Sequence, residues 1–207
     1  MASKDRRERE RNELRTRIMD AARRMIVQQG CEALSMRKLA DAIEYSPTAI
    51  YDYFKDKDSL IQEICRTDFS RLASMSREAA AIEDPIERIR QTGYGYIRFA
   101  VEHPEHYRLM FMTPHKPGPA PQDLEHKGDP EQDGYAALKI AIEEAMKQKR
   151  FKPHLTSVEL IAQVFWAAVH GVASLQITHD CSWVEFAPLE DRIRTTVDAI
   201  LDGLTVS

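Results

Sequence analysis

The sequence is poor in cysteine and in long apolar runs. Its three cysteines, Cys31, Cys65 and Cys181, are widely spaced, which predicts neither a disulfide framework nor a metal-binding motif. The longest apolar run, Val164–Val169, is far shorter than the ~20 residues that cross a bilayer. The charged N-terminal segment lacks the apolar core of a secretory signal. We therefore expect a cytoplasmic protein with no membrane partner.

Catalytic motifs are also missing. The chain has no glycine-rich phosphate loop and no nucleophile with an evident neighbouring base. His103 and His106 are separated by Pro104, whereas helical metal pairs usually occupy an uninterrupted turn. His115 and His126 lack a convergent pattern of cysteines or carboxylates, which predicts solvated side chains. We therefore expect no enzyme activity, no cofactor and no metal site.

Charge is unevenly placed along the chain. Residues 1–55 carry 12 Lys and Arg against 9 Asp and Glu, whereas the whole chain has a formal net charge of −4. A basic N-terminal part joined to an acidic remainder is typical of a protein that meets DNA at one end.

Residues 35–57 predict two short helices around a tight turn. Ser35 can cap the first helix, because its hydroxyl can accept from the free N–H groups of the next turn. Ser46, followed by Pro47 at the first helical position, can cap a second helix that runs to about Tyr53. Two short helices joined in this way predict a helix-turn-helix, whose second helix enters the major groove.

The outer face of this motif carries hydroxyl groups flanked by cations. Both kinds of group hold phosphate oxygens, and Ser, Thr and Arg also read base edges. The alternative is an ordinary solvated helix pair with a few surface tyrosines, and we favour DNA binding. The hydroxyl groups belong to Ser46, Thr48, Tyr51 and Tyr53, and the cations to Arg37, Lys38, Lys55 and Lys57.

Residues from 18 to 60 also follow a family pattern, made by Ala21, Ala22, Gly30, Leu39, Ala40, Ser46, Ala49, Ile50, Tyr51, Tyr53, Phe54, Lys55, Lys57 and Leu60. In these residues the chain resembles the DNA-binding domain of the TetR (tetracycline-repressor-like) transcriptional regulators. The resemblance implies that Tyr51, Tyr53 and Lys57 contact phosphate. It also implies that the groove is faced by Arg37, Ser46, Pro47, Thr48 and Ala49.

The turn departs from the family pattern at two positions. Glu44 stands where the family usually has glycine, and a residue other than glycine occupies a left-handed turn at some cost. We expect its carboxylate to point away from DNA. Tyr45 replaces a smaller apolar residue, so we expect a local difference in packing.

The domain organisation follows from charge and helical periodicity. Residues 1–11 alternate in charge without an apolar anchor and predict a disordered segment. Its arginines at positions 6, 7, 9 and 11 form either an arm that reaches DNA or a solubilising tail. Residues 12–56 are the predicted DNA-binding domain, whose first helix runs from about Asn12 to Gln29. Residues 57–207 are the predicted ligand-binding and dimerisation domain.

The remaining pattern predicts an all-α fold with about nine helices in total. The C-terminal helices are expected over about 57–81, 86–102, 104–112, 134–150, 157–178 and 188–204. Residues 113–133 hold five of the ten prolines and predict a loop. A loop of this length is usually functional or disordered, and we expect a mobile segment near a pocket entrance.

The last two predicted helices suggest a homodimer. The helix over 157–178 is apolar around most of its circumference, so two sides of it must be buried. Paired across a two-fold axis, the two helices would form a four-helix bundle; the alternative buries both faces internally. We favour the dimer, because a helix-turn-helix normally needs two copies to read two half-sites. The predicted interface residues are Ala167, Gly171, Ser174, Ile193, Val197, Ile200 and Leu201.

A second pattern is Trp166, His170 and Gly171, preceded by residues 103–111 with the sequence HPEHYRLMF. It resembles the WHG-type C-terminal regulatory domain of one TetR subgroup. Trp166 and His170 are four residues apart and share a helical face, although His170 can also be read as a satisfied buried histidine. Met and aromatic side chains line adaptable pockets but also fill cores. The predicted ligand-binding residues are Tyr94, Ile97, Tyr107, Met110, Phe111, Tyr135, Phe165, Trp166 and His170.

We interpret the chain as a dimeric DNA-binding transcriptional regulator, with repression as the favoured activity. A small, apolar or aromatic effector bound in the C-terminal domain would release it from double-stranded operator DNA. The alternative is a ligand-independent helix-turn-helix DNA-binding protein.

Overall fold

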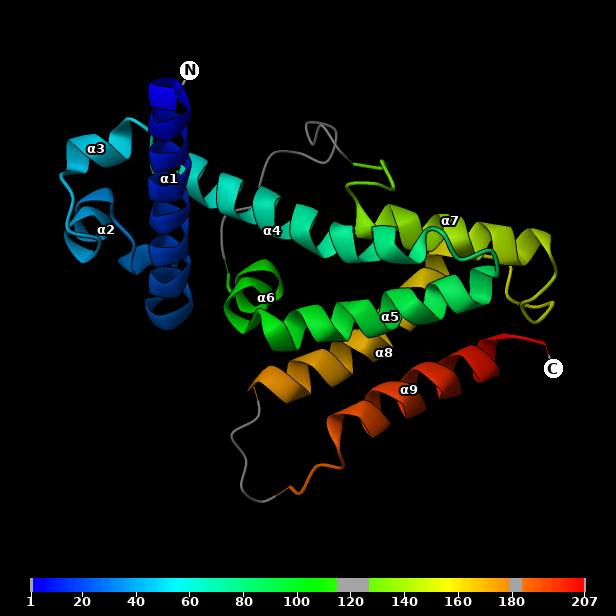
Figure 1. Cartoon of the computed structure of the whole chain (residues 1–207). Helices are drawn as coiled ribbons and strands as arrows, with labels where there is room; N and C mark the ends of the chain where they lie inside the picture. The colour runs from blue at the N-terminus through cyan, green and yellow to red at the C-terminus, as the bar shows by residue number, and fades with distance from the viewer. Residues whose placement is uncertain (1, 115–126, 179–183, 207) are drawn as a thin grey trace. The chain divides into compact units, whose positions relative to one another are not determined.

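The computed structural model describes residues 2–114, 127–178 and 184–206. Over these ranges the chain forms nine α-helices, one short 3-10 helix and no strand apart from an isolated bridge between Phe151 and Thr205 (Figure 1). The predicted all-α fold is therefore confirmed. The helices are α1 (Ala2–Gln29), η1 (Cys31–Ala33), α2 (Met36–Ala42), α3 (Pro47–Tyr51), α4 (Lys57–Ala79), α5 (Pro85–Glu102), α6 (Pro104–Phe111), α7 (Gly134–Lys147), α8 (Val158–Thr178) and α9 (Leu189–Leu204).

The chain divides into two compact units. The first comprises residues 1–68 and 105–118, and the second comprises residues 69–104 and 119–207. Helix α4 therefore contributes residues to both units, and nearly all of α6 belongs to the first. Of the predicted loop over 113–133, residues 115–126 lie outside the described residues, and so do His115 and His126.

The N-terminal helix corrects one prediction. Residues 1–11 are predicted to be disordered, but α1 begins at Ala2 and runs without a break to Gln29. Arg and Glu are good helix formers, and Arg6 lies 3.5 Å from Glu10 one turn later, a spacing that supports an isolated helix. Alternating charge at this point therefore belongs to a solvated helix.

The core of the first unit is built from the apolar stripes of α1, α2 and α4. Ile18, Leu39, Ile50 and Leu60 are fully buried in it, together with Leu109 of α6. Figure 1 shows α2 and α3 beside α1, as the shared core requires. Burial of one apolar side chain of this size contributes ~1.5–3 kcal/mol, so the short helices α2 and α3 are stabilised chiefly by this core.

The second unit is a helical bundle centred on α5. Helix α5 packs against α7, α8 and α9, and α8 packs against both α7 and α9 (Figure 1). Asp84 caps α5 by accepting from the backbone N–H of Ile86 at 2.8 Å. Ion pairs join α5 to its neighbours, from Arg88 to Glu144 of α7 and from Arg90 to Asp198 of α9.

Two helix ends in this unit have local causes. Helix α7 stops at Lys147, three residues before the predicted end, because Lys149 adopts a positive φ of 58° that no α-helix continues through. Helix α8 is capped by Ser157, whose hydroxyl accepts from the backbone N–H of Leu160 at 3.2 Å. By length and composition alone α8 is also apolar enough to cross a membrane.

Gly93 of α5 marks a very close approach within the bundle. A Cβ atom at this position would lie 2.7 Å from the ring of Phe165 and 3.3 Å from a methyl group of Val169. Phe165 is itself buried, with 2% of its surface exposed, so it has little room to move. Gly93 therefore permits the close approach of α8 to α5.

The substitution Gly93→Ala should therefore destabilise the protein, by about 1–3 kcal/mol of overpacking, offset in part by the better helix propensity of alanine. Urea unfolding followed by circular dichroism measures the difference. The matched control is Gly203→Ala in α9, where, outside the helix's own backbone, none of the described residues lies within 4 Å of the added Cβ. Equal stability of the two variants would contradict the prediction.

Candidate DNA interface and effector site

Helix α3 is short, capped and exposed on one face. The Ser46 hydroxyl accepts from the backbone N–H of Ala49 at 3.2 Å, and Pro47 occupies the first helical position, as predicted. Ile50 is fully buried beneath the helix, whereas Pro47, Thr48 and Tyr51 are exposed. The buried anchor fixes the helix, so its small and hydroxyl-bearing face is presented to solvent in a fixed orientation.

The turn before α3 has the predicted left-handed backbone. Glu44 has a φ of 61°, a conformation that costs an ordinary residue roughly 1 kcal/mol. The backbone N–H of Tyr45 closes the turn on the carbonyl of Ala40 at 2.9 Å. The Tyr45 side chain stays 39% exposed, with the guanidinium of Arg17 stacked over its ring at 5.5 Å. The larger residue is thus accommodated outside the core.

Cations flank α3 on both sides. Arg37 and Lys38 are exposed on α2, Lys55 is exposed after α3, and Lys57 is half-buried at the start of α4. Asp56 caps α4 by accepting from the backbone N–H of Ser59 at 2.7 Å, and this bond lowers the pKa of its carboxyl group. All eight predicted DNA-contacting residues therefore lie in the first unit, within or beside α2, α3 and the start of α4.

Tyr53 differs from Tyr51 in its surroundings. Tyr51 is 53% exposed, whereas Tyr53 is half-buried against the core of the first unit. The guanidinium of Arg11 lies over the Tyr53 ring, 5.7 Å from its centroid. This contact was not predicted from the sequence, because Arg11 was placed in a disordered segment.

A buried polar network connects three helices of the first unit. Arg23 of α1 donates to both carboxylate oxygens of Asp68 on α4, at 3.0 and 2.7 Å, and also to Asp20 at 2.6 Å. The side chains of Arg23 and Asp68 are only 4% and 1% exposed. His106 of α6 places Nδ1 2.8 Å from an oxygen of the same Asp68. This network was not predicted, although an arginine beside the apolar stripe of the first helix was a possible signal.

The nine predicted ligand-binding residues are divided between the two units. Tyr107, Met110 and Phe111 belong to the first unit, and the other six belong to the second. Ile97, Tyr107 and Phe165 are buried core residues, with no more than 2% of their surfaces exposed. The structure brings Tyr135 and His170 to Trp166, and Trp166 and His170 also contact Tyr96, a residue that the ligand prediction did not include.

These side chains form a polar aromatic cluster. Trp166 Nε1 donates to the Tyr96 hydroxyl at 3.0 Å, and that hydroxyl lies 3.0 Å from His170 Nδ1. The rings of Tyr135 and His170 stand edge-on to Trp166, with centroids 6.1 and 6.0 Å away. Burial lowers the pKa of His170, which favours a neutral imidazole whose Nδ1 accepts from Tyr96. The cluster thus combines flat apolar surfaces with hydrogen-bonding groups.

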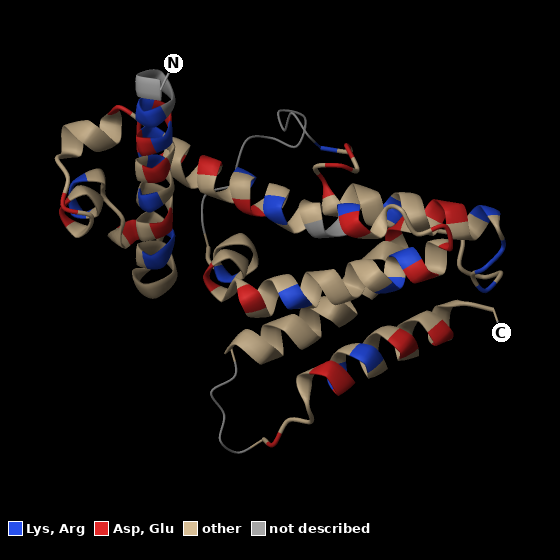
Figure 2. Ribbon diagram, viewed as in Figure 1, with Lys and Arg blue, Asp and Glu red and all other residues tan. Residues whose placement is uncertain are grey.

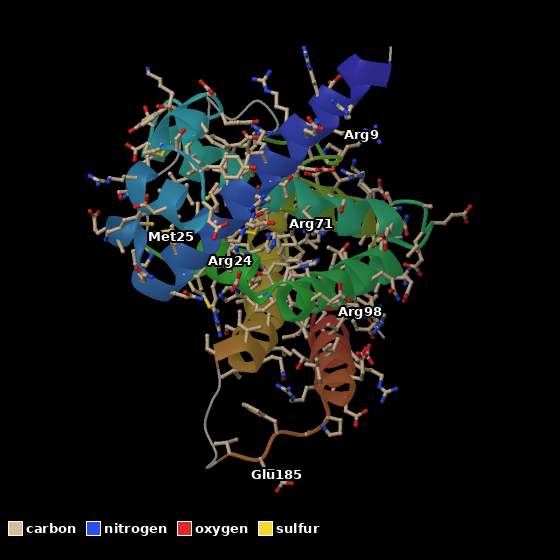
Figure 3. The ribbon with its side chains drawn as sticks, turned by 60° about the vertical axis from the view of Figure 1, so that its left-hand side comes forward. Arg9, Arg24, Met25, Arg71, Arg98 and Glu185 are labelled. Atoms are coloured by element: carbon tan, nitrogen blue, oxygen red, sulfur yellow. The ribbon has the colours of Figure 1, made fainter. Side chains whose placement is uncertain are left out.

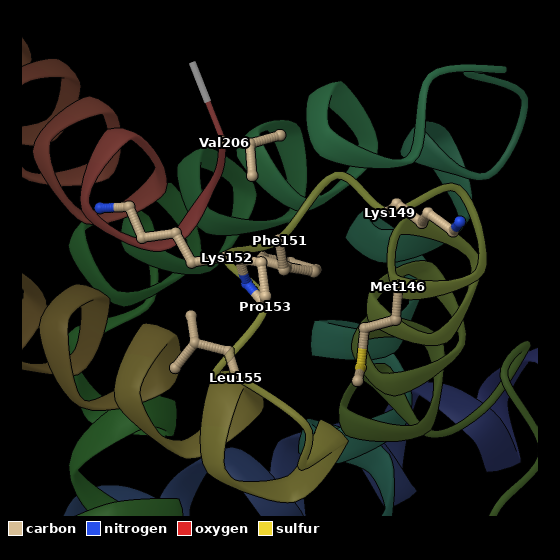
Figure 4. Close-up of a pocket in the computed structure, with 7 residues that line it drawn as sticks. All are labelled: Met146, Lys149, Phe151, Lys152, Pro153, Leu155 and Val206. Atoms are coloured by element: carbon tan, nitrogen blue, oxygen red, sulfur yellow. The ribbon is translucent and has the colours of Figure 1, made fainter.

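A separate hollow of about 240 Å³ lies where the chain's C-terminal segment passes the end of α7 (Figure 4). It is lined by Met146, Lys149, Phe151, Lys152, Pro153, Leu155 and Val206. None of the predicted ligand-binding residues lines this hollow.

Three predicted interface residues are already buried within the single chain. Ile193, Val197 and Leu201 of α9 are 3% exposed or less within the single chain, because α9 turns its apolar stripe toward α5 and α8. Ala167 of α8 is exposed, and Gly171, Ser174 and Ile200 are half-buried. An outward face of α8 also carries Leu160, Val164 and Leu175, which are 52%, 38% and 48% exposed.

The two cysteines that the structure describes are protonated thiols. Burial raises the pKa of Cys65 to about 11 and also raises that of Cys31, so neither is a thiolate at neutral pH. Among the described residues, no group of three or more His, Cys, Asp or Glu side chains is arranged to hold an ion. Cys181 lies outside the described residues.

The capped, exposed second helix and its flanking cations define a protein of the helix-turn-helix class. Two family sequence models match the chain: "Bacterial regulatory proteins, tetR family" over residues 18–64, and "Tetracyclin repressor-like, C-terminal domain" over residues 89–200. The chain therefore belongs to the TetR family of transcriptional regulators, as its motifs predicted. Membership of this family also agrees with the prediction that the chain is not an enzyme.

Individual relatives agree with this assignment. The chain is 40% identical over 65 residues to the HTH-type transcriptional repressor Rv1474c of Mycobacterium tuberculosis, covering 31% of this chain and 35% of that protein. It is 31% identical over 109 residues to the HTH-type transcriptional regulator AcrR of Shigella flexneri, covering 52% and 51%. The chain thus spans about half or less of the length of these curated relatives.

The fold extends the likeness to the whole chain. A TetR family transcription regulator from Marinobacter aquaeolei VT8 superimposes with a TM-score of 0.77 at 18% identity, over 97% of this chain and 100% of that one. At this identity the likeness concerns the fold alone.

The buried ion pair in the first unit should be a main determinant of stability. Asp68→Asn would remove the buried counter-charge of Arg23 and leave it only the partly exposed Asp20, and breaking a buried pair in this way costs about 3–5 kcal/mol. Urea unfolding measures the decrease in the free energy of unfolding.

The matched control is Glu63→Gln on the same helix. Glu63 accepts from Arg15 at 2.8 Å, but the Arg15 side chain is 41% exposed, so this change should cost about 1 kcal/mol or less. A decrease for Asp68→Asn no larger than that of the control would refute the prediction.

Proposed function

We propose that the protein is a homodimeric, cytoplasmic transcriptional repressor whose binding to operator DNA is released by a small apolar or aromatic molecule. The observation that carries the DNA-binding part is the exposed face of α3, held by the Ser46 cap and the buried Ile50. Family membership supports the same function, because regulators of this family bind operator DNA.

The proposed DNA contacts divide into two kinds. Tyr51, Tyr53 and Lys57 bind phosphate and fix the register of the protein on the duplex. Thr48, Ser46 and Arg37 lie against the major groove, where hydroxyl and guanidinium groups read base edges. Pro47 and Ala49 allow close approach because their side chains are small. Glu44 keeps its carboxylate on the far side of the turn.

The proposed effector site lies at the cluster formed by Tyr96, Tyr135, Trp166 and His170. Its flat rings would hold an apolar or aromatic molecule, and its hydroxyl and imidazole groups would orient a polar substituent. Tyr94, Ile97 and Phe165, which belong to the same unit, are proposed to shape its walls. Release then follows from a difference in effector affinity between the DNA-bound and free conformations.

The proposed dimer uses the outward face of α8. Leu160, Val164 and Leu175 lie on this face with the smaller Ala167 and Gly171 between them. Beyond its own helix backbone, no residue that the structure describes lies within 4 Å of where a Gly171 Cβ would be, which leaves room for a partner helix. A dimer of this kind would present two α3 helices to half-sites about 34 Å apart.

We expect specific, salt-sensitive binding to DNA from upstream of the protein's own gene. Fluorescence anisotropy between about 50 and 200 mM salt should give a slope near −0.9 per bound phosphate on a log–log plot. Thr48→Ala should weaken binding to that fragment about fivefold, the effect of removing one hydrogen bond of ~1 kcal/mol.

The control variant is Thr67→Ala, an exposed threonine on α4 of the same unit, which should bind as the wild type does. Equal, weak binding to native and scrambled fragments would count against operator recognition. The same assay distinguishes a repressor released by an effector from a ligand-independent DNA-binding protein. The second would stay bound to DNA when a library of small apolar and aromatic molecules is added.

Dimerisation should depend on Val164. Sedimentation equilibrium should give the wild type twice the 23.8 kDa chain mass. Val164→Glu would bury a charge at the interface and should raise the dimer dissociation constant at least about tenfold. Ile140→Glu on α7 is the control, because Ile140 is 37% exposed and Val164 is 38% exposed. A monomeric wild type, or a Val164→Glu variant that remains dimeric, would overturn the proposed interface.

A further inference from the structure

We propose that the first turns of α1 form a second phosphate-binding surface, made by Arg7 and Arg11, that adjoins the helix-turn-helix. This inference rests on the proposed DNA-binding function and extends it to a part of the chain outside the motif. The partner is the DNA backbone, recognised through charge and not through base sequence.

The first observation is that α1 extends well beyond the core of its unit. Ile18 is the first fully buried residue of the helix, and residues 6–13 are all exposed. At a rise of about 1.5 Å per residue, the segment from Ala2 to Glu13 adds ~18 Å of helix. Because the segment is helical, its side chains have fixed directions that a disordered tail would not give them.

The second observation is the direction of two arginines. Positions 7, 11, 14, 18 and 22 follow one another at helical spacing and therefore lie on one stripe. Leu14, Ile18 and Ala22 of this stripe pack against the core. Where the helix leaves the core, the stripe changes from apolar residues to Arg7 and Arg11. The arginines thus stand on the side of α1 that faces the rest of its unit.

The third observation is the contact between this stripe and the proposed DNA surface. Arg11 lies over the ring of Tyr53 at 5.7 Å, and Tyr53 is one of the proposed phosphate contacts. Arg15, one turn later, already has partners within the chain: it donates to Glu63 at 2.8 Å, and its guanidinium lies over the Phe54 ring. Arg7 and Arg11 make no ion pair with any residue that the structure describes.

The charges around these arginines leave the surface basic. Residues 6–11 contain four arginines and two glutamates (Figure 2). Glu10 is paired with Arg6 at 3.5 Å, on a different face from the stripe. Arg7 and Arg11 are separated by one turn, ~6 Å along the axis, so their guanidinium groups can reach different phosphates, which follow one another at about 3.4 Å per strand.

The test is the salt dependence of DNA binding by the full chain carrying R7Q and R11Q together. If both arginines bind phosphate, the double variant should have a log–log salt slope that is shallower by about 0.9 per arginine. Affinity should fall equally for the native and the scrambled fragment, because phosphate binding carries no sequence information. Circular dichroism should show unchanged helix content.

Two further variants test whether a change in the salt slope comes from lost phosphate contacts. R24Q changes an exposed arginine near the opposite end of the same helix (Figure 3) and should leave the slope unchanged. R7K with R11K keeps both charges but removes the planar stacking group, and should keep the wild-type slope. If the slope of the lysine pair is as shallow as that of the glutamine pair, Arg11 acts only by positioning Tyr53 and the proposal is overturned.

An unchanged slope in R7Q/R11Q would also overturn the proposal. That result is distinguishable from failure of the proposed function, because the wild type would still discriminate native from scrambled DNA. If the wild type binds neither fragment, the DNA-binding function itself fails, and the proposal fails with it.

Discussion

The first unit depends on one interaction, the buried ion pair between Arg23 and Asp68. Both side chains are almost completely removed from water, where an unpaired charge would be very costly. The guanidinium of Arg23 avoids this cost by donating to both carboxylate oxygens of Asp68. A lysine could not reproduce this geometry. The pair therefore specifies where α4 lies against α1 more narrowly than apolar packing alone would. Through His106, the same carboxylate also fixes α6.

This constraint explains why the helix-turn-helix can be so small. Helix α3 has five residues, far fewer than an isolated helix needs in water. It is stable for two reasons. The starts of the neighbouring helices α2 and α4 are capped, by Ser35 and Asp56. Ile50 is also buried in a core that includes α1 and α4, and these two helices are fixed to each other. The backbone strain at Glu44 is tolerated for the same reason, because the packing of the surrounding core fixes the conformation of the turn. Local order at the proposed DNA surface is thus a property of the whole unit.

Much of the fold could be predicted from local sequence signals. Ser35 and Ser46 act as the caps that their positions indicated, because capping depends on residues only two or three positions apart. The disordered N-terminus was wrongly predicted because alternating charge looks the same in a tail and in a solvated helix. The Arg23–Asp68 pair could not be predicted, because 45 residues separate its partners.

The site predictions were limited by a different ambiguity. An apolar stripe does not show which neighbour covers it: the sequence predicts a partner subunit over Val197, and the single chain already buries this residue. The same aromatic side chains fill cores and line pockets, so the sequence alone predicts one ligand-binding role for Tyr107, Phe165 and Trp166. Burial separates them: Tyr107 and Phe165 are no more than 2% exposed, whereas Trp166 is 37% exposed and donates its ring N–H to the Tyr96 hydroxyl.

Helix α8 shows how burial decides between interpretations of an apolar segment. Only 28% of its most apolar window is buried, so the face with Leu160, Val164 and Leu175 is left in contact with solvent. A membrane span would be apolar on every outward side, yet Gln163 is exposed and Gln176 is half-buried on this helix. An apolar stripe with small residues at its centre and polar residues along its edges is instead the pattern of a helix that packs against another helix. Because α9 has already turned its own stripe inward, the outward face of α8 would be the main source of apolar contact in a dimer. The proposed interface is therefore centred on one helix, whereas the sequence divided it between two.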